Sequence, residues 1–314
     1  MTDGALERGA REAARGFYVT GLRDRRAIEA HLSDDRAFAA YALGHLEPEL
    51  FAHAEYWAAE GPSGPAVVMH ARALGPVTVT VGDPDAVAAI LSLHPGMRLG
   101  YLSTAAPEHV RVLGRTHIVT DALHMMRMSV NPVTFEDAAG HVRRLRGHDV
   151  MRLNDLYAAD SAPTRYGAET IERAIYYGAF EGDRLASVAG THVVSPAQSI
   201  AVVGNVLTHP AHRGRGLATR VTAAVTRELL ARGCSEIVLT VDPENAPAVA
   251  AYSRLGYRRG SAVVEARLQR RDLFGLTPLW RRVAARRRGR PAGDSIEWVR
   301  ARDGRGRERP GDPR

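Results

Sequence analysis

Apolar and polar positions recur with two different periods along this chain, and their succession predicts an α/β protein. The runs VVMHARA (67–73) and PVTVTVG (76–82) are short, rich in β-branched residues and followed by turn residues, which indicates strands. Residues 34–46 and 85–93 place apolar side chains near a 3.6-residue period and therefore predict helices. A further helix is predicted from Pro48 toward Trp57, because proline suits the first helical position. We find no chemical motif in this part.

Strands and helices alternate again beyond residue 142. Strands are predicted at 185–194, 200–208, 237–241 and 263–268. Helices are predicted at 216–232 and 245–255, each followed or ended by a glycine, Gly233 and Gly256. The pair Gly204-Asn205 lies inside a predicted strand, where glycine marks a bulge, a close approach or simple packing against neighbours. With 314 residues, the chain is long enough for about two domains.

Composition adds limits on the class of protein. The chain is 45% apolar and 25% charged, as in ordinary globular proteins, and no apolar run reaches the ~18 residues that a membrane span needs. Its N-terminus mixes acids and bases without an apolar core, so we expect no secretory signal. Cys234, the single cysteine, precedes an apolar run and is expected to be a small buried side chain. One cysteine also points to a reducing cytoplasm.

The net charge of +7 does not by itself indicate a nucleic-acid partner. Residues 281–314 contain twelve arginines and five acids, and all 42 basic residues of the chain are arginine. A GC-rich genome explains the absence of lysine more simply than a phosphate-binding surface does. The segment 271–314 is rich in arginine, glycine and proline and is predicted to be mostly disordered. A nucleic-acid partner is disfavoured because this tail lacks the interleaved aromatic residues of a stacking surface.

The stretch THPAHRGRGLATRV (208–221) joins a predicted strand to a predicted helix. The start of a helix exposes unpaired N–H groups, and Gly214 and Gly216 allow a phosphate to approach them closely. Arg213 and Arg215 add charge-assisted contacts, so the segment is a candidate polyphosphate cradle. A P-loop is excluded because it requires lysine, and the dinucleotide fingerprint fails because Thr219 stands at its third small position.

This pattern resembles the GNAT superfamily of acyl-CoA N-acyltransferases. Residues 213–218 (RGRGLA) fit the signature [RQ]-x-x-G-x-[GA], and residues 245–257 (NAPAVAAYSRLGY) fit a later segment N-x-x-A-x-x-x-Y-x-x-x-G-[FY]. The resemblance implies an α/β (α+β) fold with a mixed, mostly antiparallel sheet flanked by helices. It implies an acyl-CoA-binding domain at 136–270. A smaller diverged α/β domain at 1–135 is then either a degenerate GNAT-like half or loosely similar to glycine N-acyltransferase-like proteins.

The resemblance also implies roles for particular residues. Residues expected to bind acetyl-CoA or another acyl-CoA are Val206, Leu207, Thr208, Arg213, Gly214, Arg215, Gly216, Leu217, Ala218, Thr219 and Asn245. Asn245 would hold the pantetheine amide or a water, or cap the helix that follows it. Tyr252 corresponds to the tyrosine that protonates the departing thiolate; alternatively it is a core residue of its helix.

The proton acceptor for the attacking amine is left open by the sequence. No Asp or Glu lies between Leu185 and Glu228, so the candidates are His192, His209, His212 or a water chain. The expected function is direct transfer of an acetyl group from acetyl-CoA to an amine of a small molecule, without a metal or a membrane partner. The alternative is an acyl-CoA-binding sensor without catalysis, which the missing carboxylate favours and Tyr252 disfavours.

Overall fold

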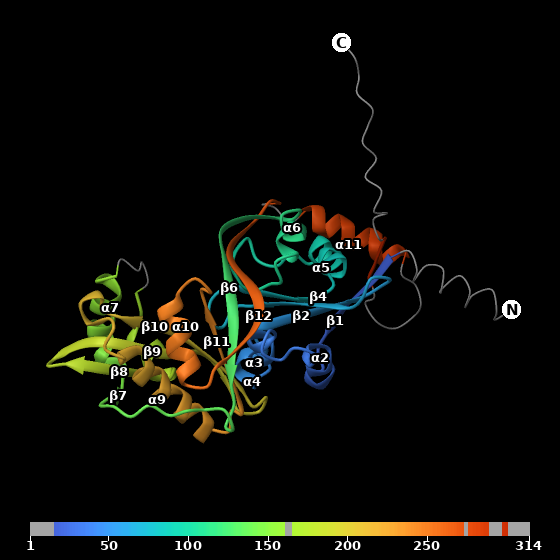
Figure 1. The fold of residues 1–314 in the computed structure, drawn as a ribbon. Helices are drawn as coiled ribbons and strands as arrows, with labels where there is room; N and C mark the ends of the chain where they lie inside the picture. The colour runs from blue at the N-terminus through green and yellow to red at the C-terminus, as the bar shows by residue number, and fades with distance from the viewer. Residues whose placement is uncertain (1–15, 161–164, 273–275, 289–296, 301–314) are drawn as a thin grey trace, which may run out of the picture.

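The computed structural model describes residues 16–160, 165–272, 276–288 and 297–300. The strands in these ranges form one sheet in the order β13-β1-β2-β3-β4-β5-β12-β6-β11-β10-β9-β8-β7, with helices packed on its faces (Figure 1). The strands are β1 (Gly16–Leu22), β2 (Ala54–Glu60), β3 (Ala66–Ala71), β4 (Val77–Gly82), β5 (Leu99–Thr104), β6 (His117–Val130), β7 (Arg143–Arg144), β8 (Tyr176–Glu181), β9 (Arg184–Ser195), β10 (Ile200–Thr208), β11 (Glu236–Val241), β12 (Arg258–Arg270) and β13 (Glu297–Arg300).

The helices connect these strands in two similar series. They are α2 (Arg25–Leu32), α3 (Ala40–Gly44), α4 (Pro48–Phe51), α5 (Pro84–Leu93), α6 (His109–Leu113), α7 (Val150–Ala158), α8 (Ala168–Arg173), α9 (Leu217–Ala231), α10 (Ala246–Arg254) and α11 (Leu276–Arg288), with 3-10 turns η1 (Gly147–Asp149) and η2 (Pro210–His212). Within these ranges, no helix is both long and apolar enough to cross a membrane.

Two pairs of neighbouring strands run parallel, β4 with β5 and β10 with β11, and all other pairs are antiparallel. A parallel pair needs a crossover connection, and here helices α5 and α9 supply one each. The predicted mixed, mostly antiparallel sheet flanked by helices is therefore confirmed.

We refer to residues 16–130 as the N-terminal half and residues 143–272 as the C-terminal half. The two halves exchange a strand at the centre of the sheet. β12 of the C-terminal half pairs with β5, whereas β6 of the N-terminal half pairs with β11. β6 and β12 also pair with each other along most of their length and cross the middle of the molecule together (Figure 1). The division into domains at 1–135 and 136–270 stays a prediction.

The starts of α5 and α9 differ in a way that the sequence explains. Asp83 caps α5 by accepting hydrogen bonds from the N–H groups of Asp85 and Ala86. Helix α9 instead starts after Gly216, which has a φ of 72° and provides no side-chain cap. The first N–H groups of α9 therefore remain available to another acceptor, whereas a carboxylate already occupies this position at α5.

A buried carboxylate holds the chain at the entrance to the C-terminal half. Asp149 is fully buried and accepts hydrogen bonds from both terminal nitrogens of Arg143, at 2.9 and 2.7 Å, and from the N–H of Arg146 at 3.1 Å. These contacts, led by the Arg143 hydrogen bond, hold the pKa of Asp149 below its usual value.

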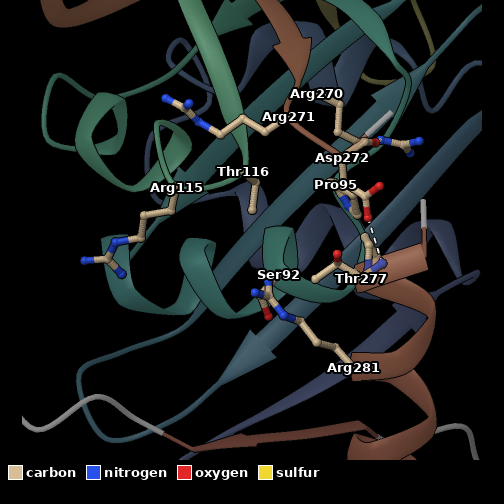
Figure 2. A pocket seen from close by; sticks show the side chains of 10 residues that line it. Ser92, Pro95, Arg115, Thr116, Arg270, Arg271, Asp272, Thr277 and Arg281 are labelled. Atoms are coloured by element: carbon tan, nitrogen blue, oxygen red, sulfur yellow. Dashed lines mark hydrogen bonds between the residues drawn. The ribbon is translucent and has the colours of Figure 1, made fainter. Parts of the chain in front are cut away.

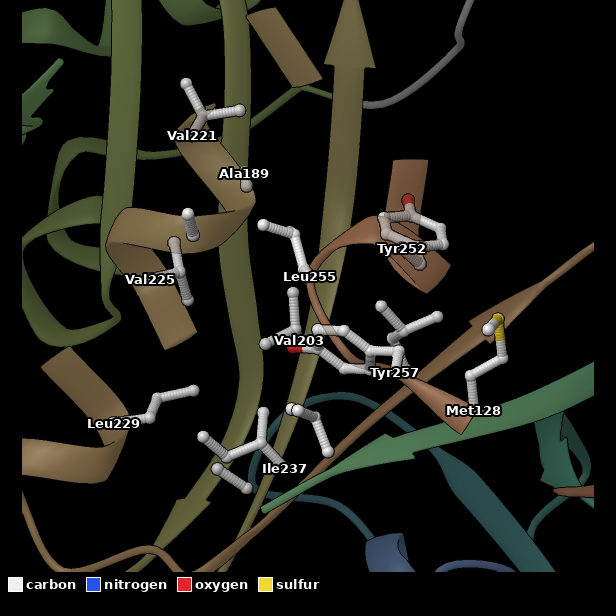
Figure 3. Close-up of a cluster of buried hydrophobic side chains, with 14 of the residues drawn as sticks. Met128, Ala189, Val203, Val221, Val225, Leu229, Ile237, Tyr252, Leu255 and Tyr257 are labelled. Carbon is white, nitrogen blue, oxygen red and sulfur yellow. The ribbon is translucent and has the colours of Figure 1, made fainter. Parts of the chain in front are cut away.

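Apolar clusters lie on both faces of the C-terminal sheet. One cluster packs α9 and α10 on the sheet and includes Val203, Val225 and Tyr252 (Figure 3). On the other face, Val193 and Val202 pack in a cluster with side chains of α3 from the N-terminal half. The sheet of the C-terminal half is thus covered on one face by its own helices and on the other face partly by α3 of the N-terminal half.

Two sequence predictions need correction. Of the helix predicted at 34–46, only α3 (Ala40–Gly44) is helical, and residues 34–39 form turns. The carboxylate of Asp35 accepts the N–H of Phe38 there, an alternative that Asp offers to helix. The helix from Pro48 ends at Phe51, and Trp57 belongs to β2, where it stacks on His94 with ring centroids 3.3 Å apart. Pairing with β1 and β3 outweighs local helical preference in this segment.

The segment 271–314 was predicted to be mostly disordered, and this stays a prediction; among its described residues the structure contains α11 and β13. Helix α11 lies along α5 (Figure 1), and its Ala285 is buried in the core of the N-terminal half. Glu297 of β13 is buried and pairs with His94 at 2.6 Å and with Arg286 at 3.0 Å. Ranges 273–275, 289–296 and 301–314 lie outside the described residues.

Candidate active site

The predicted cradle forms an open loop at the start of α9. Gly214 and Gly216 have φ values of 76° and 72°, a conformation that favours glycine. A Cβ atom added at either position would have no atom within 4 Å, so the space above the loop is empty. The uncapped N–H groups of α9 point to this side, and an anion is stabilised at such a helix start.

The two arginines of the loop are each paired with a carboxylate that the motif did not predict. A terminal nitrogen of Arg213 lies 2.7 Å from Asp160, and one of Arg215 lies 2.9 Å from Glu181. All four side chains are at least partly exposed, and exposed pairs contribute only about 0–1 kcal/mol. A phosphate can therefore replace these carboxylates at small cost.

Beyond the cradle, β10 separates from β11 and a cleft opens between them. The two strands pair only from Ile200 to Val203, and the register of β10 against β9 shifts between Gly204 and Leu207. The cleft has a volume of about 250 Å³ and is lined by Tyr157, Val203, Gly204, Asn205, Val206, Leu207, Leu239, Thr240 and Tyr252. The irregularity predicted at Gly204-Asn205 is confirmed, and Val206 and Leu207 lie in the cleft wall as the cofactor hypothesis requires.

Asn205 is held in its conformation by three tyrosines. Its φ of 55° is one that asparagine tolerates better than most residues. The Tyr157 hydroxyl donates to its carbonyl oxygen at 2.7 Å, the Tyr166 hydroxyl donates to its Oδ1 at 2.9 Å, and its Nδ2 donates to the Tyr176 hydroxyl at 2.8 Å. This network fixes the bulge of β10. Sequence reasoning missed it, because its members are far apart in the chain.

Tyr252 is a core residue of its helix that also lines the cleft, and its role as a proton donor stays a prediction. Its ring is 7% exposed and packs near Tyr257 in the core, with centroids 6.0 Å apart, and it also lines the cleft (Figure 3). Burial raises the pKa of Tyr252 to about 12, so the hydroxyl is protonated at neutral pH. Such a group can act as a proton donor to a strong base generated in the cleft.

The other predicted cofactor residues surround the cradle and the cleft. Leu217 is buried under the first turn of α9, and Ala218 and Thr219 lie beside it, partly exposed. Thr208 shares a hydrogen bond with Ser187 at 2.8 Å. Asn245 caps α10 by accepting the N–H of Ala248 at 3.2 Å, so its helix-capping role is confirmed. The binding roles of these residues stay predictions.

The structure separates the three candidate histidines. His209 accepts the N–H of Ala211 at 3.2 Å, and His212 contacts Arg215 at 3.1 Å, so both belong to the cradle loop. His192 lies on β9, and a methyl group on Gly204 would lie 2.4 Å from its ring. His192 is thus the one of the three that lies against the lining of the cleft.

A second and larger cavity lies in another part of the molecule. It has a volume of about 470 Å³, lies beside α11, and is lined in part by Arg115, Arg270, Arg271 and Arg281 (Figure 2). Arg270 and Arg271 also donate to backbone carbonyl oxygens and thereby fix the end of β12. The lining of this cavity contains none of the residues that the acyl-CoA motif predicts.

Comparison with known proteins agrees with the geometry. Residues 148–257 match the model of the acetyltransferase (GNAT) family, so this part of the chain is similar to a GNAT acetyltransferase domain. Over 96 residues the chain is 36% identical to the mycothiol acetyltransferase of Catenulispora acidiphila; the match covers 28% of this chain and 30% of that protein. The chain thus matches about a third of the length of this curated relative.

Solved structures support the fold over a longer part of the chain. A Drosophila protein has a TM-score of 0.57 at 14% identity, covering 80% of this chain and 98% of its own. A GCN5-related N-acetyltransferase from Kribbella flavida has a TM-score of 0.50 at 16% identity, covering 75% of this chain and 95% of its own. The similarity of the N-terminal half to glycine N-acyltransferase-like proteins stays a prediction.

Proposed function

We propose that this protein is an N-acyltransferase that transfers an acetyl group from acetyl-CoA directly to an amine of a small molecule. The observation that carries the proposal is the continuity of the site. The open cradle at Gly214 and Gly216 leads along β10 into the cleft, where Tyr252 contributes a protonated hydroxyl. A diphosphate at the cradle would place the rest of an extended acyl-CoA along β10, with its thioester in the cleft.

Two chemical demands of the reaction have candidate groups in the cleft. Backbone N–H groups near Val206 and Leu207, which lie beyond the part of β10 that pairs with β11, would stabilise the negative charge that develops on the carbonyl oxygen. Tyr252 would give its proton to the sulfur as the carbon–sulfur bond breaks. Cys234 is buried, and burial raises the pKa of its thiol, so an acyl-cysteine route is disfavoured. A free buried thiol also suits the reducing cytoplasm that we propose as the compartment.

The N-terminal half would then be a diverged GNAT-like copy without a cofactor site of its own. Its helix α5 occupies the place between β4 and β5 that α9 occupies between β10 and β11. Asp83 caps α5, and a carboxylate at this position repels phosphate. The partial similarity to a mycothiol acetyltransferase supports a small-molecule acceptor.

An acyl-CoA sensor without catalysis remains the second candidate, and one observation favours it. The described parts of β9 and β10 carry no carboxylate that could accept the amine proton. The two candidates differ in one respect only, which is turnover.

The proposal is tested by titrating acetyl-CoA into the full-length protein by calorimetry and then measuring thiol release with a panel of small primary amines. Tyr252→Phe should bind acetyl-CoA within about twofold of the wild type but turn over at least ~100-fold more slowly, because it lacks the acid. Tyr257→Phe is the matched control, since it removes a neighbouring buried hydroxyl that bonds only to Thr226 among the described residues. Absence of acetyl-CoA binding would refute the proposal, and binding without turnover would favour the sensor.

A further inference from the structure

His192 lies on β9 directly against the irregular part of β10. A methyl group on Gly204 would lie 2.4 Å from both its Nε2 and its Cε1 atoms, so this edge of the ring faces the strand that lines the cleft. The side chain is nevertheless exposed to solvent. The ring therefore lies beside the strand that lines the cleft and is also open to solvent.

The opposite edge of the ring is held by the N-terminal half. Nδ1 of His192 shares a hydrogen bond with the hydroxyl of Tyr41, a residue of α3 that lies 151 positions earlier in the chain. Tyr41 is itself fixed, because it is buried in the core and the guanidinium of Arg127 lies 5.3 Å from its ring centroid. Since α3 packs in one core cluster with Val193 and Val202 of β9 and β10, the contact joins two rigid elements.

Charged and polar groups from four elements act on the ring of His192. They are Tyr41 of α3, Arg127 of β6, Asn205 of β10 and Glu265 of β12. Although His192 reaches solvent, the protein packed around it excludes much of the bulk water, and this desolvation is the largest effect and lowers the pKa of His192. The Arg127 guanidinium lowers this pKa further, while Asn205 and Glu265 raise it. The imidazole is therefore neutral at neutral pH and can accept a proton. Asn205 and Glu265 stabilise the imidazolium that results.

Arg127 is unusual in its own right. It is fully buried, it donates to Thr240 and Thr104, and its Nε has no hydrogen-bond partner among the described residues. A buried cation close to Tyr41 and His192 keeps the imidazolium from forming before an amine arrives. Because Thr240 lines the cleft, Arg127 links this pair to the site.

Resting on the proposed N-acyltransferase activity, we propose that His192 is its general base and that Tyr41, from the N-terminal half, is the residue that positions it. In the reactive tautomer Nδ1–H donates to the Tyr41 hydroxyl oxygen and Nε2 is unprotonated. The amine nitrogen forms its bond to the thioester carbon, and one amine proton passes to Nε2 of His192. The carbon–sulfur bond breaks, the sulfur takes the proton of Tyr252, and solvent returns the proton from His192 to Tyr252.

Kinetics with acetyl-CoA and the amine that the wild type accepts best in the panel test both roles. His192→Ala should lower kcat at least ~100-fold while leaving the KM for acetyl-CoA within about twofold. Tyr41→Phe keeps the ring beneath Arg127 and removes only the hydroxyl, so kcat should fall roughly tenfold at unchanged KM for acetyl-CoA. Tyr56→Phe is the control, because it removes a buried hydroxyl that donates to Ala42 at 2.7 Å and does not touch His192.

The pH profile distinguishes a positioning role from a structural one. A base must be unprotonated, so wild-type kcat should be retained above the pKa of His192 and lost as pH falls through it, below the ordinary histidine value of about 6.5. This acid limb should shift in Tyr41→Phe, disappear in His192→Ala and stay unchanged in Tyr56→Phe.

Nitrogen-15 NMR of the full-length protein tests the pair without any substrate. The ring signals of His192, assigned by their loss in His192→Ala, should show a protonated Nδ1, and this preference should weaken in Tyr41→Phe. A protonated Nε2 in the wild type, or wild-type kcat in His192→Ala, would overturn the assignment. If either result occurs while the wild type still binds acetyl-CoA and turns over, only the role of His192 is refuted. If the wild type does not bind acetyl-CoA, the proposed acyltransferase function is refuted instead.

Discussion

The cradle assignment predicts a specific effect of one substitution, Gly216→Glu. With a φ of 72° at this position, any residue other than glycine is strained by about 1–2 kcal/mol. The added Cβ meets nothing within 4 Å, so no steric clash contributes. The new carboxylate would stand beside the start of α9, where the diphosphate of acetyl-CoA is proposed to bind.

The electrostatic cost can be worked from Coulomb's law. Two unit charges about 5 Å apart at an effective dielectric constant of about 20 repel by roughly 3 kcal/mol. At ~1.4 kcal/mol per factor of ten, the Kd for acetyl-CoA should rise on the order of 100-fold. Higher ionic strength should reduce this effect, because the loop is exposed and salt screens exposed charges.

Gly233→Glu is the matched control at the other end of the same helix. Gly233 has a φ of 90° and likewise has no atom within 4 Å of an added Cβ, so the strain is comparable. Both variants should lose similar thermal stability, but only Gly216→Glu should lose affinity in a calorimetric titration with acetyl-CoA. Equal affinities in the two variants would show that the start of α9 is not a phosphate site.

Two further predictions concern the cleft and the entrance to the C-terminal half. Gly204→Ala should push the ring of His192 aside, because the new Cβ would lie 2.4 Å from that ring. This variant should lower kcat at least tenfold with little change in acetyl-CoA affinity. Gly260→Ala is the control, since its Cβ would make an ordinary 3.4 Å contact, and it should leave kcat unchanged. The pKa of Asp149 is depressed in the folded state, so its stabilisation is present above the unfolded value of about 3.9 and lost as pH falls below it. Asp149→Asn weakens the charge-assisted hydrogen bonds at this position and should therefore lower the free energy of unfolding by about 2 kcal/mol at pH 7. It should also flatten the dependence of stability on acid pH, as measured by urea unfolding between pH 3 and 7. Equal slopes for variant and wild type would contradict that account.

The cradle and the C-terminal elements could be predicted from the sequence because their signals are local. Glycine at positions with positive φ, a proline before the turn and a 3.6-residue apolar period each act within a few residues. The predicted segments 216–232 and 245–255 therefore correspond closely to α9 and α10. The capping role of Asn245 was likewise foreseeable from its position before a helix.

The remaining parts of the site could not be predicted, because contacts between distant segments create them. The partner of His192 is Tyr41, and nothing near either residue indicates the other. Asp160 and Glu181 reach the cradle arginines only once β8 and α7 are folded. Trp57 reads as part of a helix in isolation, and strand pairing with β1 and β3 decides its structure.

The exchange of β6 and β12 has a consequence for how the chain acquires its structure. β5 can complete its pairing only when β12 has been synthesised, as the bond from Tyr101 to Glu265, 164 positions later, illustrates. A nascent N-terminal half therefore exposes a free strand edge, which is an aggregation hazard until β12 has been synthesised. Such distant pairing also slows folding. Cutting the gene between the halves should yield two fragments that fail alone and regain structure only when they are produced together.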